Sequence, residues 1–69
     1  MKIIYTYELY EEQNESLEFN SLSEFLSHKR GKMFRELLSL PRVNVLDKLI
    51  IELNYPTVIT IEFIKEKQQ

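Results

Sequence analysis

Apolar and polar residues alternate along two stretches of this chain, residues 3–10 and 58–64, and this period of two constrains the fold more than any other feature. Successive side chains of a β-strand point to opposite faces of a sheet, so the alternation predicts strands. It resumes at Leu17 and Phe19, and again over residues 48–53. We therefore expect two β-hairpins. The first has a polar, acidic loop at EEQNES (residues 11–16), and the second has a turn at NYPT (residues 54–57).

Between the hairpins, the sequence predicts a helix that begins with a capping box. In SLSE (residues 21–24), the Ser21 hydroxyl can accept a hydrogen bond from the Glu24 backbone N–H, while the Glu24 carboxylate reaches back. Pro41 is expected to end the helix, because proline has no amide proton to donate. The apolar positions rotate by about a quarter turn across Gly31. A bend or break at Arg30 or Gly31 is therefore predicted.

These elements define one α+β domain spanning residues 1–69. The predicted plan is ββαββ, an antiparallel sheet with one kinked helix or two short helices packed on one face. A right-handed crossover bringing the third strand beside the first gives the order 2-1-3-4. VNVL (residues 43–46) fits either an extended link or a turn of helix, and residues 65–69 are expected to be a frayed tail.

Several kinds of chemistry are missing from the sequence. It has no cysteine, one histidine and one glycine, which excludes disulfides, the usual zinc spacings and glycine-rich phosphate loops. His28 is flanked by cations rather than by an orienting carboxylate, so we interpret it as an ordinary surface residue. We expect no enzyme, no cofactor and no metal. We also expect no signal peptide and no membrane span, hence a cytoplasmic protein.

The charges are unevenly distributed. Residues 1–27 carry six glutamates against one lysine, whereas residues 28–42 carry five lysines and arginines against one glutamate. The basic stretch has three interpretations. It could be a solvated face that pairs with the acidic hairpin, or part of a protein interface in which Arg30 and Arg35 bind carboxylates. Alternatively, it could be a nucleic-acid surface formed by Lys29, Arg30, Lys32 and Arg35.

One face of the predicted sheet lies opposite the helix, and it is only half polar. If the strands adjoin as predicted, its apolar members form a contiguous patch with a charged rim: Ile4, Tyr10, Ile50, Val58 and Ile64. Such a patch indicates association, most simply as a homodimer. The alternative is that these residues are scattered and serve only β propensity.

The order of sequence features resembles a known family. An acidic hairpin, LEFNSLSEF (residues 17–25) opening a helix, and the strand LDKLIIELN (residues 46–54) are similar to the small phage-encoded inhibitors of uracil-DNA glycosylase. The similarity spans residues 3–54 and departs from the family at Gly31 and at the strand 58–64. It implies a small phage or plasmid protein that works by occupying a host protein.

The sequence therefore predicts a non-enzymatic protein-protein interaction module, an inhibitor encoded on a phage or other mobile element that blocks a host or defence protein. The residues expected to bind the partner are those of the outer sheet face together with the acidic loop: Ile4, Tyr10, Ile50, Val58, Ile64, Glu11, Glu12 and Glu15. The alternative is a small nucleic-acid-binding accessory protein that uses the basic stretch 29–35.

Overall fold

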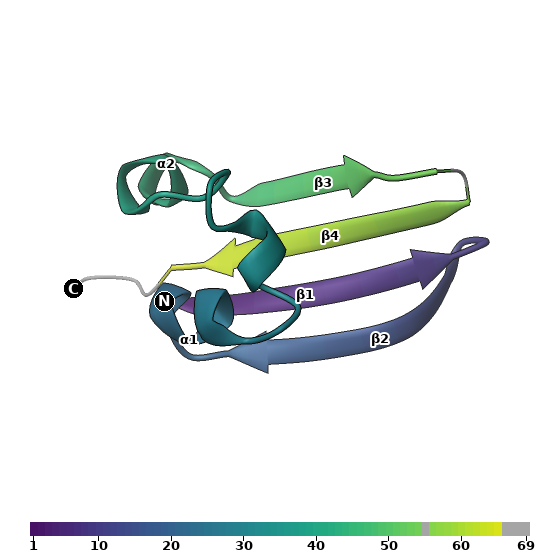
Figure 1. Cartoon of the computed structure of the whole chain (residues 1–69), viewed down its shortest axis with the longest axis horizontal. Helices are drawn as coiled ribbons and strands as arrows, with labels where there is room; N and C mark the ends of the chain where they lie inside the picture. Colours follow the sequence, from purple (N-terminus) through teal and green to yellow (C-terminus); the bar gives the residue numbers. More distant parts are fainter. Residues whose placement is uncertain (55, 66–69) are drawn as a thin grey trace.

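The computed structural model of the chain describes residues 1–54 and 56–65. Within them the elements run β1 (Lys2–Leu9), β2 (Glu12–Phe19), α1 (Leu22–Ser27), the 3-10 helix η1 (Lys32–Phe34), α2 (Leu40–Val45), β3 (Lys48–Glu52) and β4 (Thr57–Ile64). The strands form one antiparallel sheet, and the helical segments lie across one end of it (Figure 1). The predicted α+β class and the ββαββ plan are confirmed.

The strand order is β2-β1-β4-β3, so the predicted order 2-1-3-4 is wrong. β1 pairs with β4 along its whole length, with Lys2 opposite Ile64 and Leu9 opposite Thr57. Both β1 and β3 are antiparallel to β4, and they therefore run parallel to each other. Placing β3 beside β1 would have required a parallel pair. The observed order makes every neighbouring pair antiparallel, which is slightly more stable per residue.

The first hairpin is tighter than predicted. The acidic segment from Glu12 onward belongs to β2, and the turn consists of Tyr10 and Glu11 alone. Both residues have positive φ, 54° and 63°. Two-residue hairpin turns with φ above zero at both positions match the twist of the flanking strands. The predicted loop at residues 11–16 is therefore wrong, because a left-handed turn closes the hairpin before the polar residues are reached.

Helix α1 begins as predicted and ends early. The Ser21 hydroxyl accepts a hydrogen bond from the Glu24 backbone N–H at 3.1 Å. The helix stops at Ser27, before the predicted break at Arg30 or Gly31. His28 is extended, and its ring Nδ1 accepts the backbone N–H of Arg30 at 3.0 Å. This local bond takes the place of a helical one, which explains why the helix ends three residues sooner.

Pro41 lies in the first turn of α2 and does not end a helix. The Ser39 hydroxyl caps α2 by accepting the Arg42 backbone N–H at 3.4 Å. Proline fits the first turn of a helix, where its missing N–H has no intrahelical partner in any case. The predicted stop at Pro41 is therefore wrong. Residues 43–45 of the ambiguous VNVL segment are helical, so the second of the two short helices lies beyond the proline.

Gly31 is needed for a close approach of two backbone segments, not for a left-handed turn. Its φ of −85° and ψ of −24° are open to any residue. A Cβ atom at this position would lie 1.8 Å from the carbonyl oxygen of Phe25 and 2.5 Å from the carbonyl carbon. No side chain can be accommodated at such distances. The glycine thus allows the chain entering η1 to pack directly against α1.

The core lies between the helical segments and the end of the sheet that they cover. Phe25 of α1 is fully buried at its centre, with ring centroids 5.1 Å from Phe19, 6.1 Å from Phe34 and 6.3 Å from Tyr5. The buried apolar residues are Ile3, Tyr5, Phe19, Phe25, Phe34, Leu38, Val43, Ile59, Ile61 and Phe63. Alternate residues of β1 and β4 therefore face this core, as the period of two predicted.

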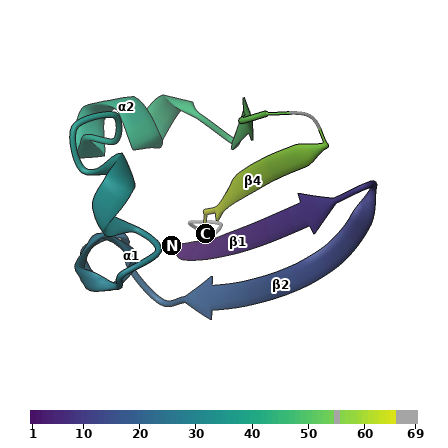
Figure 2. The same cartoon turned by 45° about the vertical axis from the view of Figure 1, so that its right-hand side comes forward.

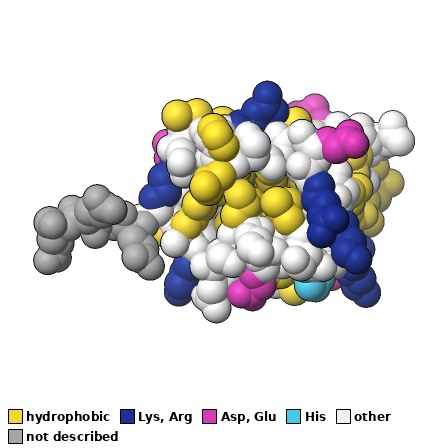
Figure 3. Space-filling model, turned by 60° about the vertical axis from the view of Figure 1, so that its left-hand side comes forward, with side chains coloured by type: hydrophobic (Ala, Val, Ile, Leu, Met, Phe, Trp, Pro, Cys, Tyr) yellow, Lys and Arg dark blue, Asp and Glu magenta, His cyan; other side chains and the backbone are white. Residues whose placement is uncertain are grey.

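The helical end of the molecule has a mixed apolar and basic surface. Met33, Leu37, Leu40 and Val45 are all exposed there. Figure 3 shows hydrophobic side chains gathered at the middle of one side of this end, with lysine and arginine side chains along its edges. At the start of the predicted tail, the Lys65 Nζ donates to the Asn44 carbonyl oxygen at 2.9 Å. The rest of that tail, residues 66–69, lies outside the described residues.

Candidate functional site

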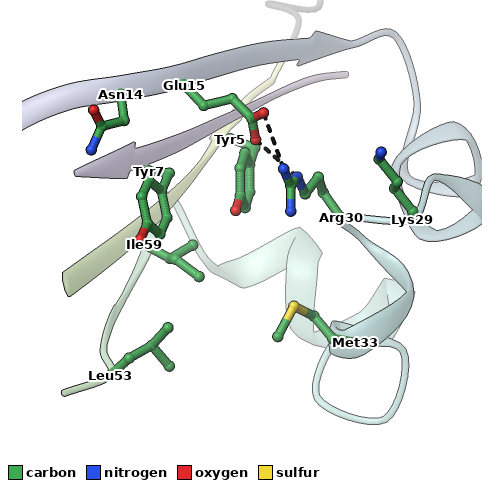
Figure 4. A pocket seen from close by; sticks show the side chains of 9 residues that line it. All are labelled: Tyr5, Tyr7, Asn14, Glu15, Lys29, Arg30, Met33, Leu53 and Ile59. Carbon is green, nitrogen blue, oxygen red and sulfur yellow. Dashed lines mark hydrogen bonds and ion pairs between the residues drawn. The ribbon is translucent and has the colours of Figure 1, made fainter. Parts of the chain in front are cut away.

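A groove lies on the helix-bearing face of the sheet, beyond the end that the helices cover. Figure 2 shows the helical segments gathered at one end, while β1 and β2 continue past them toward their turn. The hollow measures about 480 Å³. Its lining comes from β1, β2, η1 and β4, from the segment between α1 and η1, and from the residue that follows β3: Tyr5, Tyr7, Asn14, Glu15, Lys29, Arg30, Met33, Leu53 and Ile59 (Figure 4).

The register of the sheet builds the floor of the groove. Tyr7 lies opposite Glu15 of β2 on one side and opposite Ile59 of β4 on the other. Tyr5 lies two residues earlier on the same face and is only 3% exposed, whereas Tyr7 is half-buried. No hydrogen-bond partner for either phenol is found among the described residues. Both hydroxyls can therefore bind a group that enters the groove.

A β-bulge shapes the wall formed by β2. The register shifts between Tyr7 and Glu8, so that Asn14 is the extra residue on β2. A bulge bends its strand and changes the direction of nearby side chains. As a result, the neighbouring residues Asn14 and Glu15 both line the groove, whereas in a regular strand they would point to opposite faces.

Arg30 connects the basic stretch to the acidic hairpin. Its Nε lies 3.0 Å from Glu15 Oε1, and its second guanidinium nitrogen donates to Glu15 Oε2 at 3.3 Å (Figure 4). This is the bidentate geometry that an arginine and a carboxylate favour. Both side chains are partly exposed, so solvent limits the pair to at most about 1 kcal/mol. Its main effect is positional, because it ties the α1–η1 segment to β2 along one wall of the groove.

The remaining basic residues of the stretch divide into two kinds. The Arg35 side chain binds the backbone of α1, since its Nε donates to the Leu26 carbonyl oxygen at 3.1 Å. Lys29 lies at the groove, and Lys32 begins η1 on the exposed surface. The four cations predicted for a nucleic-acid surface are thus not equivalent. The two arginines bind other groups of the chain, whereas the described residues provide no hydrogen bond or ion pair to the side chain of either lysine.

His28 has a structural role that the sequence did not predict. It is half-buried, and its ring packs edge-on against Phe19 with centroids 5.1 Å apart. Its Nδ1 accepts the Arg30 backbone N–H at 3.0 Å, so the ring is held on both sides.

The residues predicted to form an apolar association surface do not make one contiguous patch. On the outer face, Ile4 lies between Glu18 and Glu62 on the neighbouring strands. Val58 likewise lies between two glutamates, Glu8 of β1 and Glu52 of β3. The prediction of one contiguous patch is therefore wrong. The changed strand order and the charged cross-strand neighbours leave two separate groups. Ile4 is diagonal to Ile64, and Ile50 is diagonal to Val58, which lines a second, smaller hollow together with Tyr10.

The acidic residues predicted to bind a partner also separate in the structure. Tyr10 and Glu11 form the hairpin turn, and Glu12 begins β2. Glu15 alone of this group lies in the groove.

Sequence reasoning missed most of the groove, yet the signal was available. Tyr7, Met33, Leu53 and Ile59 were not recognised as site residues. A helix of six residues spans about 9 Å, whereas a strand of eight residues spans about 26 Å. Once the helix was expected to break, half of the sheet had to remain uncovered on the core side.

The environment of Tyr5 leads to a prediction about alkaline pH. Burial raises the pKa of its phenol above the usual 10.0; Arg30 opposes this shift, and Glu15 and Tyr7 add to it. The folded state therefore holds this proton more tightly than the unfolded chain does, so its contribution to stability is complete below pH 10 and is lost as the pH rises further. Ultraviolet titration should show a late tyrosine ionisation that Tyr5→Phe removes and Tyr10→Phe retains. A late step that persists in Tyr5→Phe would contradict this assignment.

Within residues 1–54 and 56–65, no cluster of three or more histidine, cysteine or acidic side chains could hold a metal ion. In the same part of the chain, no helix has the length and apolar character needed to cross a bilayer. No protein-family model, no curated protein and no solved structure matches this chain. The resemblance to the phage inhibitors thus gains no support from these comparisons.

Proposed function

We propose that this chain is a non-enzymatic protein-binding module, and that its groove receives a segment of another protein. The observation that supports this proposal most is the uncovered half of the sheet on its core-facing side. There the half-buried Tyr7 forms the floor beside Ile59, which is itself only 2% exposed, and Met33 and Leu53, 65% and 47% exposed, stand at the walls. Tyrosine and methionine are enriched at protein interfaces, because they combine large apolar area with adaptable contacts.

The lining indicates the chemistry of the segment that would bind. The apolar floor suits a large aliphatic or aromatic side chain, and the Asn14 amide and the two phenols suit backbone groups beside it. Glu15 neutralises Arg30, so Lys29 remains to attract a carboxylate at the rim. We therefore expect the partner to present an apolar residue next to an aspartate or glutamate.

The size of the molecule suits a protein that acts by occupying a surface. A groove on a small domain can block a contact that its partner needs elsewhere. In this proposal the partner is a host or defence protein, the module is an inhibitor encoded on a phage or other mobile element, and both act in the cytoplasm.

Nucleic-acid binding through Lys29, Arg30, Lys32 and Arg35 stays the alternative prediction. It is weaker because Arg30 pairs with Glu15, and the Arg35 side chain donates to a backbone carbonyl. A mobility-shift titration at two salt concentrations tests it, since binding to phosphates weakens steeply as salt rises.

Selection from a random peptide library on the immobilised protein tests the groove. We expect enriched peptides to combine a large apolar residue with an acidic one. Their affinity should fall at least about tenfold for Met33→Glu, because the new carboxylate would lie at the apolar wall and repel the acidic residue. Fluorescence polarisation with a labelled peptide measures the change.

Val45→Glu is the matched control, since it introduces the same charge at an apolar side chain that is 80% exposed and does not line the groove. It should leave peptide affinity unchanged. Equal losses in both variants, or no enrichment of peptides, would exclude the groove as the binding site. Tight binding of nucleic acid that collapses with salt would favour the alternative.

A further inference from the structure

The edge strand β3 carries a sequence that is complementary in charge to a second copy of itself running in the opposite direction. β3 is an edge strand, and no part of the described chain lies beyond it in the sheet (Figure 1). Its residues read Lys48, Leu49, Ile50, Ile51, Glu52. If a second copy of the strand runs antiparallel to it, centred on Ile50, then Lys48 of each copy lies opposite Glu52 of the other. Leu49 then lies opposite Ile51.

The backbone is correctly phased for this pairing. Along an antiparallel ladder, residues whose N–H and C=O bind the partner strand alternate with residues whose groups point away. The bonds from Leu53 N–H to the Thr57 carbonyl and from Phe63 N–H to the Asp47 carbonyl place the odd-numbered residues of this segment in the bonded positions toward β4. The N–H and C=O groups of Lys48, Ile50 and Glu52 therefore point to the open edge.

The side chains at these three positions suit the same contact. All three are exposed on the outer face, and Ile50 is 58% exposed. In the centred register, the two copies of Ile50 would cover each other. Lys48 already lies opposite Glu62 of β4, so the second copy would place it between two carboxylates. Alternating charges across neighbouring strands stabilise a sheet.

The other edge of the sheet does not have this property. β2 carries Glu12, Glu15 and Glu18 and no lysine or arginine. Two copies of β2 would bring carboxylates together, and such like-charge contacts discourage pairing at an edge. The charges thus distinguish the two edges of the sheet. The β2 edge would repel a second copy of itself, whereas the β3 edge is complementary to one.

From this register and these charges we infer that the chain forms a symmetric homodimer through β3, joining two four-stranded sheets into one continuous sheet. The interface is the strand edge at residues 48–52, and the occupant is a second copy of the same strand. The contact is separate from the groove, and each protomer of the dimer keeps its own groove. It also differs from the predicted association through the outer sheet face, because the apolar contact reduces to Ile50.

A charge exchange tests the register directly. Lys48→Glu and Glu52→Lys each turn both symmetric ion pairs into like-charge contacts, so each variant alone should weaken dimerisation at least about tenfold. The double exchange, Lys48→Glu with Glu52→Lys, should restore most of it, since the ion pairs between protomers return while a carboxylate at position 48 also lies opposite Glu62 of β4. An equimolar mixture of the two single variants should form a heterodimer, because the unlike charges again face each other. Sedimentation equilibrium measures all four samples.

Glu36→Lys is the control for net charge, since it makes the same change as Glu52→Lys at an exposed position on the helical side. It should dimerise like the unaltered chain, and circular dichroism should show that every variant is folded. A monomer for the unaltered chain at high concentration would overturn the inference. This register would also be excluded if the single exchanges left dimerisation as strong as in the unaltered chain. It would be excluded as well if the double exchange dimerised no better than the single ones.

Discussion

Replacing Gly31 by alanine is expected to lower the free energy of unfolding by about 3 kcal/mol, at the upper end of the range for overpacked sites. The added Cβ would lie 1.8 Å from the Phe25 carbonyl oxygen, so the segment entering η1 would have to move away from α1. That movement would also disturb the Arg30–Glu15 pair and the Phe25–Phe34 contact. A domain of this size has a total stability of about 3–10 kcal/mol, so the loss is large. Urea unfolding followed by circular dichroism measures it.

Lys32→Ala is the control for Gly31→Ala. It introduces alanine at the next residue, which is exposed, and it should change stability by less than about 0.5 kcal/mol. If Gly31→Ala proved as stable as this control, the close approach of the two backbone segments would have to be wrong.

Replacing Phe25 by alanine should cost about 4 kcal/mol and leave much of the protein unfolded at room temperature. The ring is fully buried and contacts the rings of Tyr5, Phe19 and Phe34, so its removal opens a cavity where the helical segments meet the sheet. A chain without cysteine has no disulfide that could limit this loss. Thermal unfolding monitored by circular dichroism should show a much lower midpoint or no cooperative transition.

Two further variants define the cause of that loss. Phe25→Leu keeps most of the volume and should recover the greater part of the stability. Leu40→Ala removes an apolar side chain that is 57% exposed and should cost less than about 1 kcal/mol. A small effect of Phe25→Ala would mean that the aromatic cluster does not anchor the helical segments.

Much of the fold followed from local patterns. Alternation identified the strands, and Ser21 marked the start of α1, because these signals depend on neighbouring residues alone. The strand order did not follow, since it depends on which pairing a long connection permits. The role of Pro41 was misassigned, and the close approach at Gly31 was not predicted, for a related reason. Proline is suited to starting a helix as well as to ending one, and glycine can be required by contact with Phe25, which is six residues away in sequence.

The site was harder to predict than the fold. The ionic contact between the basic stretch and the acidic hairpin was among the interpretations of the charge distribution, and the Arg30–Glu15 pair confirms it. The groove forms instead where the helices are too short to cover the sheet. Tyr7 and Ile59 have the pattern of ordinary core residues in the sequence. Tyr7 lies beyond the end of α1 and is half-buried in an open groove, whereas Ile59 beside it remains a core residue that is 2% exposed.

The central pair of the sheet joins residues 2–9 to residues 57–64. During synthesis, the first hairpin leaves the ribosome long before β4 has been made. One side of β1 therefore stays unpaired while the helical segments and β3 are synthesised. Contacts so distant in sequence slow folding, because a long loop must close before they form. During this interval the opposite edge of the hairpin is the less adhesive one, since β2 carries three glutamates that discourage pairing between nascent chains.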